Sequence, residues 1–325
     1  MTDDTTGTAP VPPTETAETV TQSRKREPKT KADKIAAAAA YAFEDDSPET
    51  RAFYARFLIL AGMPYSDPGD TSTWTRSAGN RILTLQPGAN LDPRVLANLK
   101  EGEPPPSGYP YGILPRYVMT WIATEVRKKH SRTLHTGKSL TAFLEKLGLT
   151  CTGGPTGTID RFHSQFWRLL TCRITSTSPV IAGDKFHWDS FNIADDITVW
   201  GERVSPGGHL AGAEITLTQK CFEELHEHAV PYNPFALPQF TGSAFQLDLY
   251  LWLVYRLFYL REPTLITWKQ LQAQFGSNTK ETRFFRRHFL RALIPVRHVY
   301  KGANITIAKT GIILRSSPRH RSVLP

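Results

Sequence analysis

The sequence predicts a helix-rich α+β protein made of two tandem winged-helix (helix-turn-helix) domains that follow a disordered N-terminal tail. Two observations lead to this fold class. An order of helices followed by strands occurs in the first half of the chain and again in the second, although the two halves share little sequence. The charge is also uneven: residues 279–325 contain 11 basic side chains and one acidic side chain, Glu281, while the whole chain carries a formal net charge of +9. The C-terminal element therefore presents a strongly basic face.

The chain divides into four segments. Residues 1–33 are rich in Thr, Pro, Glu and Lys and have little to bury, so we expect this tail to be disordered. The remaining length is long for one core, and a hydrophobic fraction of 40% is sufficient for two. We place an N-terminal winged-helix domain at residues 34–205, a C-terminal winged-helix domain at residues 206–318, and a short tail at residues 319–325.

Helical patterns open the first domain, at Lys34–Tyr41 and Ser47–Gly62. Ser47 is a suitable N-cap for the second of these helices, and Pro48 occupies its first position. The segment 63–110 is irregular, and we interpret it as an arm of strands and loops. Three further helices and two strands are expected at Leu114–Lys129, Ser139–Leu147, Thr156–Thr171, Arg173–Ile181 and Phe186–Trp200.

The second half repeats this order after a strand and a helix, Ala213–Leu217 and Thr218–Ala229. A buried helix is expected at Ser243–Arg261, because its sequence is apolar apart from a few polar positions. The elements that follow are a strand at Leu265–Thr267, a helix at Trp268–Phe275, a turn at 276–278, a basic helix at Thr279–Leu293 capped by Thr279, and strands at Val296–Tyr300, Ile305–Ala308 and Ile312–Leu314.

The basic helix is the candidate DNA-reading element. At about 100° per residue, its cations Lys280, Arg283, Arg287 and Arg291 fall within an arc of about 80°, with Arg286 at the margin and Phe285 and Phe289 opposite. Side chains near the helix N-terminus reach base edges most easily; these are Asn278, Thr279, Lys280 and Arg283. We expect phosphate contacts from Arg287, Arg291, Arg297 and Lys301. The alternative interpretation is a solvated basic helix without a ligand.

A weaker version of this surface occurs in the first domain. Arg161, Gln165 and Arg168 share one face of the helix Thr156–Thr171. With only two cations, this face could read DNA, hold a phosphate or contact a partner, and the sequence leaves the three alternatives open.

Motifs of enzymes, metal sites and membrane proteins are not recognisable. The Gly-rich segment Gly153–Gly157 is not followed by the Lys-Ser/Thr of a nucleotide-binding loop, and His226 and His228 would point in nearly opposite directions on a helix. Cys151, Cys172 and Cys221 have no metal-ligand spacing and are typical of buried thiols in a reducing compartment. The first twenty residues contain no apolar run, and Leu247–Leu260 is too short and too charged to span a bilayer. We therefore expect a cytoplasmic protein that is not an enzyme and has neither cofactor nor metal.

Six segments of the chain, taken together and in order, carry a resemblance to a known family: Pro110–Arg116, Ser139–Gly148, Thr152–Arg161, Asp248–Leu253, Trp268–Gly276 and Phe284–Leu293. They resemble the plasmid-encoded RepA-type replication initiators of Gram-negative bacteria. The resemblance implies a monomer–dimer initiator, associated with the plasmid in the bacterial cytoplasm, that binds direct repeats (iterons) in origin DNA. It also implies that such a protein promotes melting of the origin and recruits the host replication initiator and helicase.

The resemblance also distributes roles between the two domains. Sequence-specific contacts are implied for the C-terminal domain, and by position they fall to Lys280, Arg283, Arg286, Arg287 and Arg291. Backbone contacts to DNA and the dimer interface are implied for the N-terminal domain. A dimeric winged-helix repressor that binds an inverted repeat is the nearest alternative, and autorepression is compatible with initiation. A rolling-circle nicking enzyme is a more distant alternative.

Overall fold

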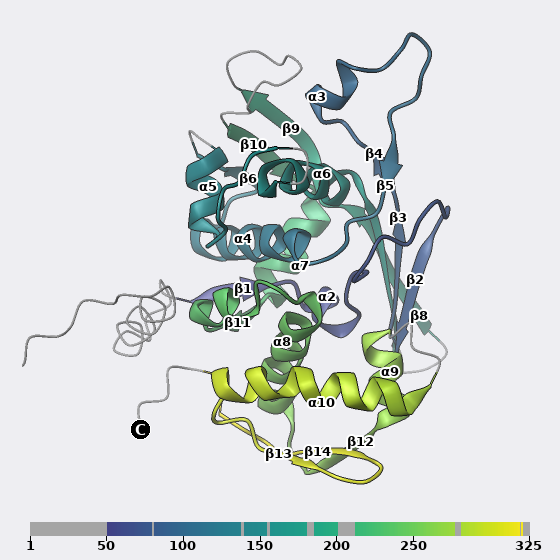
Figure 1. The fold of residues 1–325 in the computed structure, drawn as a ribbon, viewed down its shortest axis with the longest axis vertical. Helices are drawn as coiled ribbons and strands as arrows, with labels where there is room; N and C mark the ends of the chain where they lie inside the picture. The colour runs from purple at the N-terminus through teal and green to yellow at the C-terminus, as the bar shows by residue number, and fades with distance from the viewer. Residues whose placement is uncertain are drawn as a thin grey trace, which may run out of the picture.

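The computed structural model describes residues 51–79, 81–137, 140–154, 157–180, 185–200, 212–276, 281–318 and 320. The expected disordered tail, the helix Lys34–Tyr41 and the proposed cap at Ser47 lie outside the described residues, as does most of the C-terminal tail. Helices and strands are mixed along the described chain, as expected for an α+β protein (Figure 1).

The first unit is a helical layer with a three-stranded antiparallel sheet. Its strands follow the spatial order β6-β10-β9. Its elements are α4 (Leu114–Lys129), β6 (Thr133–His135), α5 (Leu140–Lys146), α6 (Thr158–Thr171), β9 (Ala194–Trp200) and β10 (Gly212–Leu217). The strand β10 lies beyond the expected domain boundary at residue 205, yet it pairs on both sides with strands of this first unit.

The second unit repeats the same order of elements. Its strands follow the order β12-β14-β13, so in both units the last strand lies in the middle of the sheet. Its elements are α8 (Ala244–Tyr259), β12 (Thr264–Thr267), α9 (Trp268–Phe275), α10 (Thr282–Val299), β13 (Ile305–Ile307) and β14 (Gly311–Leu314). The predicted repetition is thus present in the topology, where a shared order of pairing can persist without shared sequence.

An arm and a second sheet extend along one side of the molecule (Figure 1). The sheet has the order β2-β3-β7-β8 and is antiparallel throughout. Its strands are β2 (Trp74–Ala78), β3 (Arg81–Gln86), β7 (Arg173–Val180) and β8 (Lys185–Asn192). The arm continues through β4 (Gly88–Ala89), α3 (Pro93–Leu96) and β5 (Ser107–Gly108), and β2 contacts α9 of the second unit. The segment 63–110 is therefore an arm of strands and loops, as interpreted from the sequence.

The two units share one continuous hydrophobic core. A pair of short antiparallel strands, β1 (Ala52–Tyr54) and β11 (Val230–Tyr232), lies between them. The helices α2 (Arg56–Leu60) and α7 (Gln219–His228) and the 3-10 helix η2 (Pro234–Phe240) complete the junction, with α2 against α8 and α7 against α4.

Three expectations about local structure are wrong. The described part of the helix expected at Ser47–Gly62, residues 51–62, is instead the strand β1 followed by the five-residue helix α2, because pairing with β11 overrides local helical propensity. The single strand expected at Phe186–Trp200 is two strands in different sheets: β8 pairs with β7 beside the arm, and β9 pairs with β10. The strand expected at Val296–Tyr300 is mostly the last turn of α10, which continues through Pro295 because Val296 is buried on the same face as Phe289.

Candidate nucleic-acid interface

The helix α10 is held by an aromatic cluster beneath it. Phe285 and Phe289 are fully buried, and the ring of Phe289 lies 5.8 Å from that of Trp268 and 6.0 Å from that of Phe275. The supporting helix α9 is itself fixed at both ends, by a capping box between Thr267 and Gln270 and by a left-handed Gly276. The apolar face of α10 is therefore packed against a helix that is capped at both ends.

The opposite face of α10 carries exposed cations. Arg283, Arg286, Arg287, Arg291 and Arg297 on the helix are all exposed, as is Lys301 just after it. The Arg283 guanidinium lies over the Phe284 ring with 4.7 Å between its central carbon and the ring centroid, and that of Arg287 lies over the same ring at 5.4 Å. Burial and the neighbouring Arg291 lower the pKa of His288, which disfavours a further charge at this position.

Part of the N-terminal end of this basic face lies outside the described residues. Asn278, Thr279 and Lys280, expected to reach base edges, lie outside the described residues. The described helix begins at Thr282 with Glu281 as its N-cap, so it starts three residues later than expected. Glu281 also pairs with Arg283 at 2.5 Å, although both side chains are more than half exposed, and solvent weakens such a pair.

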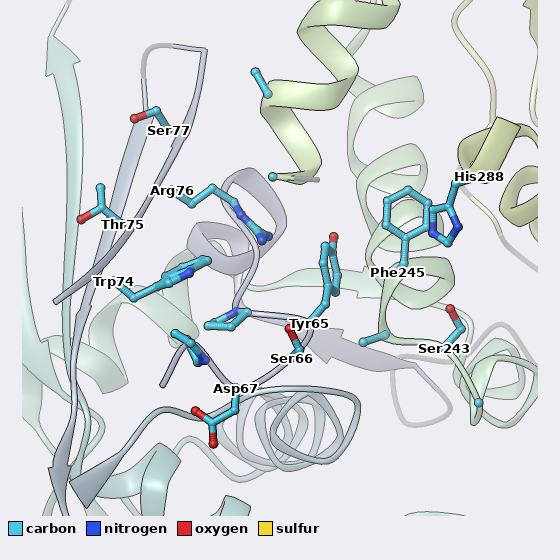
Figure 2. A pocket seen from close by; sticks show the side chains of 16 residues that line it. Tyr65, Ser66, Asp67, Trp74, Thr75, Arg76, Ser77, Ser243, Phe245 and His288 are labelled. Carbon is cyan, nitrogen blue, oxygen red and sulfur yellow. The ribbon is translucent and has the colours of Figure 1, made fainter. Parts of the chain in front are cut away.

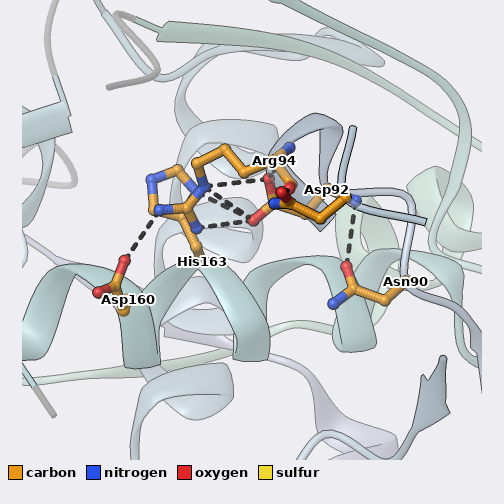
Figure 3. A network of polar contacts seen from close by, with 6 residues as sticks. Asn90, Asp92, Arg94, Asp160 and His163 are labelled. Carbon is orange, nitrogen blue, oxygen red and sulfur yellow. Dashed lines mark hydrogen bonds and ion pairs between the residues drawn. The ribbon is translucent and has the colours of Figure 1, made fainter. Parts of the chain in front are cut away.

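The helix α6 of the first unit is covered by the arm (Figure 3). Arg94 of α3 donates to Asp160 of α6 at 2.9 Å and to Asp92 at 2.7 Å. The Asp92 side chain is almost fully buried and lies 3.9 Å from the ring of His163, which is on α6. The arm is thus tied to the N-terminal half of α6 by a network of buried and half-buried charges.

The three candidate residues of α6 consequently have different surroundings. Gln165 is buried, and its side-chain oxygen accepts a hydrogen bond from the Tyr111 amide at 2.8 Å. Arg168 donates to Asp67 at 3.1 Å and lies over the Tyr111 ring. Arg161 alone of the three is exposed. Gln165 and Arg168 are therefore engaged by residues of the same chain, in and next to the arm, which the sequence did not indicate.

A buried ion pair joins the two units and has no counterpart among the expected site residues. Arg116 of α4 donates to both carboxylate oxygens of Asp248 of α8, each at 2.7 Å, and also to the Met63 carbonyl at 2.8 Å. Burial opposes the charge on Arg116, but Asp248 outweighs this effect and holds the pKa of Arg116 above its ordinary value. The sequence feature that indicated this ion pair was an aspartate inside a largely apolar helix, because a buried charge requires a partner.

Arg76 of β2 extends this polar cluster to the second unit. Its guanidinium donates to the Gly62 carbonyl at 2.8 Å and lies between the rings of Tyr65 and Trp74. A cavity of about 880 Å³ opens beside it, lined by β2, the first residues of α8, Gly276 and His288 (Figure 2). This cavity marks the junction between the arm and the α9–α10 pair.

Residues 109–270 match the family model described as plasmid encoded RepA protein. This part of the chain matches a family of plasmid-encoded RepA replication initiators. The RepA match covers just under half of the chain and runs from the residue after β5 into the first turn of α9. The arm up to residue 108 and the whole of α10 lie outside it, so the assignment of α10 depends on the geometry described above.

A solved structure supports the fold over a longer range. The chain is similar to the selenomethionine derivative of domain 2 and domain 3 of RctB, with a TM-score of 0.50 and 13% sequence identity, over 83% of this chain and 98% of that one. At this identity the similarity concerns the fold alone. No curated protein matches the chain.

The described part of the chain has neither a metal-ligand cluster nor a membrane-spanning helix. It contains no cluster of three or more His, Cys, Asp or Glu side chains suited to hold a metal ion. His226 instead lies 2.8 Å from the His130 ring nitrogen, and His228 lies near Glu224. None of the described helices has the length and apolar character needed to cross a membrane.

Proposed function

We propose that this protein initiates plasmid replication by binding double-stranded origin DNA through α10. In this proposal each unit is a winged helix, α10 is the recognition helix that enters the major groove, and the β13–β14 hairpin is the wing. The observation that carries the proposal is the outward row of Arg283, Arg287 and Arg291 on a helix whose other face is locked by aromatic packing. The match to the RepA family supports the replication role.

The chemistry of this surface suits DNA. Arginine pairs with the O6 and N7 atoms of guanine in the major groove, and each cation placed on a phosphate releases condensed counterions. Arg283 and Arg287 share the Phe284 ring, which limits the conformations that they must lose on binding. We assign base contacts to Arg283 in the first turn of α10, and phosphate contacts to Arg287, Arg291, Arg297 and Lys301.

The remaining parts of the proposed function are those that the resemblance to RepA initiators implies. The protein binds direct repeats, and several bound copies melt the adjacent AT-rich duplex and recruit the host replication initiator and helicase. A monomer–dimer equilibrium controls the active form. The protein acts in the bacterial cytoplasm through binding energy, without catalysis, cofactor or metal. For the first unit we assign DNA backbone contact to Arg161, because the arm occupies Gln165 and Arg168.

The substitution Arg287→Ala tests the role of α10. It should weaken binding to origin DNA by about 1–3 kcal/mol, because an exposed cation aimed at DNA is lost without change to the buried face. The measurement is a fluorescence anisotropy titration of the full-length protein with labelled origin duplex at fixed salt.

The matched control is Arg173→Ala. Arg173 is equally charged and exposed, but it lies on β7 in the arm-side sheet. The control should bind DNA as the wild type does. Equal affinities of the two variants would remove α10 from the DNA interface.

A further inference from the structure

Phe284 is an unusual residue for the basic face of α10. It is 40% exposed and is the third residue of the helix, within the first turn. At about 100° per residue it lies about 20° from Arg291 and about 60° from Arg287, so it belongs to the outward arc rather than to the core. The aromatic cluster is on the other face, so the exposed part of this ring is available to an apolar partner from outside the described chain.

The ring is also held in place. The guanidinium groups of Arg283 and Arg287 lie over it at 4.7 Å and 5.4 Å, and the remaining ring surface faces solvent between them. Any DNA phosphate or guanine that these two arginines bind will therefore be a near neighbour of the exposed ring.

The major groove offers one apolar group, the C5-methyl of thymine, and phenylalanine is among the side chains that contact it. We propose that Phe284 contacts a thymine methyl group and makes α10 select thymine at one position of its site. This inference rests on the proposed function, since it requires α10 to lie in the major groove. It adds to that function a base-specific apolar contact, made by Phe284 beside the arginine contacts of the same helix.

Replacement of thymine by deoxyuridine removes only the methyl group and leaves base pairing intact. Each thymine of the protected site would be replaced in turn, and the affinity of the full-length protein measured. The wild type should lose about fourfold in affinity at one thymine, the effect of one buried methyl group. Phe284→Ala should bind the unmodified site more weakly and show no further loss when that thymine is replaced.

Two variants make the test specific. Phe284→Leu keeps an apolar side chain but loses the stacked arginines, so it should keep part of the response to deoxyuridine. Phe258→Ala removes a ring that is 37% exposed on α8 and should respond as the wild type does.

Two results would overturn the inference. If Phe284→Ala loses affinity equally for the thymine and deoxyuridine duplexes and still responds at the same position, the ring only supports the arginines. If no thymine replacement affects the wild type, there is no methyl contact. In both cases a loss of binding by Arg287→Ala would leave the proposed function standing, whereas a wild type that does not bind origin DNA would remove both.

Discussion

At the junction of the two units, stability is sensitive to the loss of a single charged side chain. Arg116 has no solvent exposure, Asp248 has 8%, and the two form a bidentate pair across 132 positions of sequence. Burying such a pair is costly, so its net contribution is small, but loss of one partner leaves the other charged and unpaired.

Asp248→Asn is therefore expected to destabilise the protein by about 3–5 kcal/mol, because it keeps the shape of the side chain and removes the charge that compensates Arg116. The free energy of unfolding is measured by urea titration. Asp195→Asn is the control, since Asp195 pairs with Arg132 while 54% of its side chain is exposed, and it should cost less than about 1 kcal/mol. If Asp248→Asn and the wild type have the same urea midpoint, groups other than Asp248 compensate the charge of Arg116.

Prediction from sequence succeeds for residues whose environment depends on their own helix. The outward direction of Arg283, Arg287 and Arg291 follows from the helical period alone, and the structure agrees. The same period placed Gln165 and Arg168 on one face of α6, but segments of the arm from residues 67–111 cover that face. No local pattern in α6 could have indicated this cover.

At the scale of elements, the turn before α10 depends on the arm. Gly276 ends α9 with a φ of +55°, and a Cβ atom at this position would lie 2.3 Å from Nε of Arg76. The helix α9 is also fastened by Gln274, which donates to the Leu60 carbonyl at 2.7 Å. The arm and α2 thus fix the position from which α10 begins.

Gly276→Ala should destabilise the protein by more than the roughly 1 kcal/mol that a left-handed alanine costs by itself, because Arg76 must also move. Gly102→Ala is the matched control: its φ is +79°, and no atom lies within 4 Å of the added Cβ. Urea unfolding of both variants gives the two costs. If the two substitutions destabilise the protein equally, Arg76 moves away at no cost and the arm does not fix the end of α9.

Element boundaries are predictable where a local signal is strong. The helix α4 spans the residues expected, and Gly276 ends α9 as expected. The helix α10 extends past Pro295, where a strand was expected, because burial of Val296 outweighs the missing hydrogen bond of the proline. The arm strand β3 pairs with β7, about ninety residues away, and β2 joins this sheet through β3, which a local pattern does not reveal.

At the scale of the whole molecule, two units with one topology share a single core. The repeated order of elements is predictable because each unit must bury the apolar faces of its own helices. The junction is not predictable from local patterns, because it is made of short strands such as β1 and β11, which pair across about 180 residues. The consequence is that α10 has a defined position relative to α6 and the arm.

The central claim is that this molecule binds repeated sites in plasmid origin DNA through α10. Its most direct test is a nuclease footprint of the purified full-length protein on the DNA that flanks its own gene. Several protected direct repeats, spaced by whole helical turns beside an AT-rich tract and absent with Arg287→Ala, are the predicted result. A single protected inverted repeat would indicate a dimeric repressor and contradict the initiation claim, and the absence of any protection would contradict the DNA-binding claim itself.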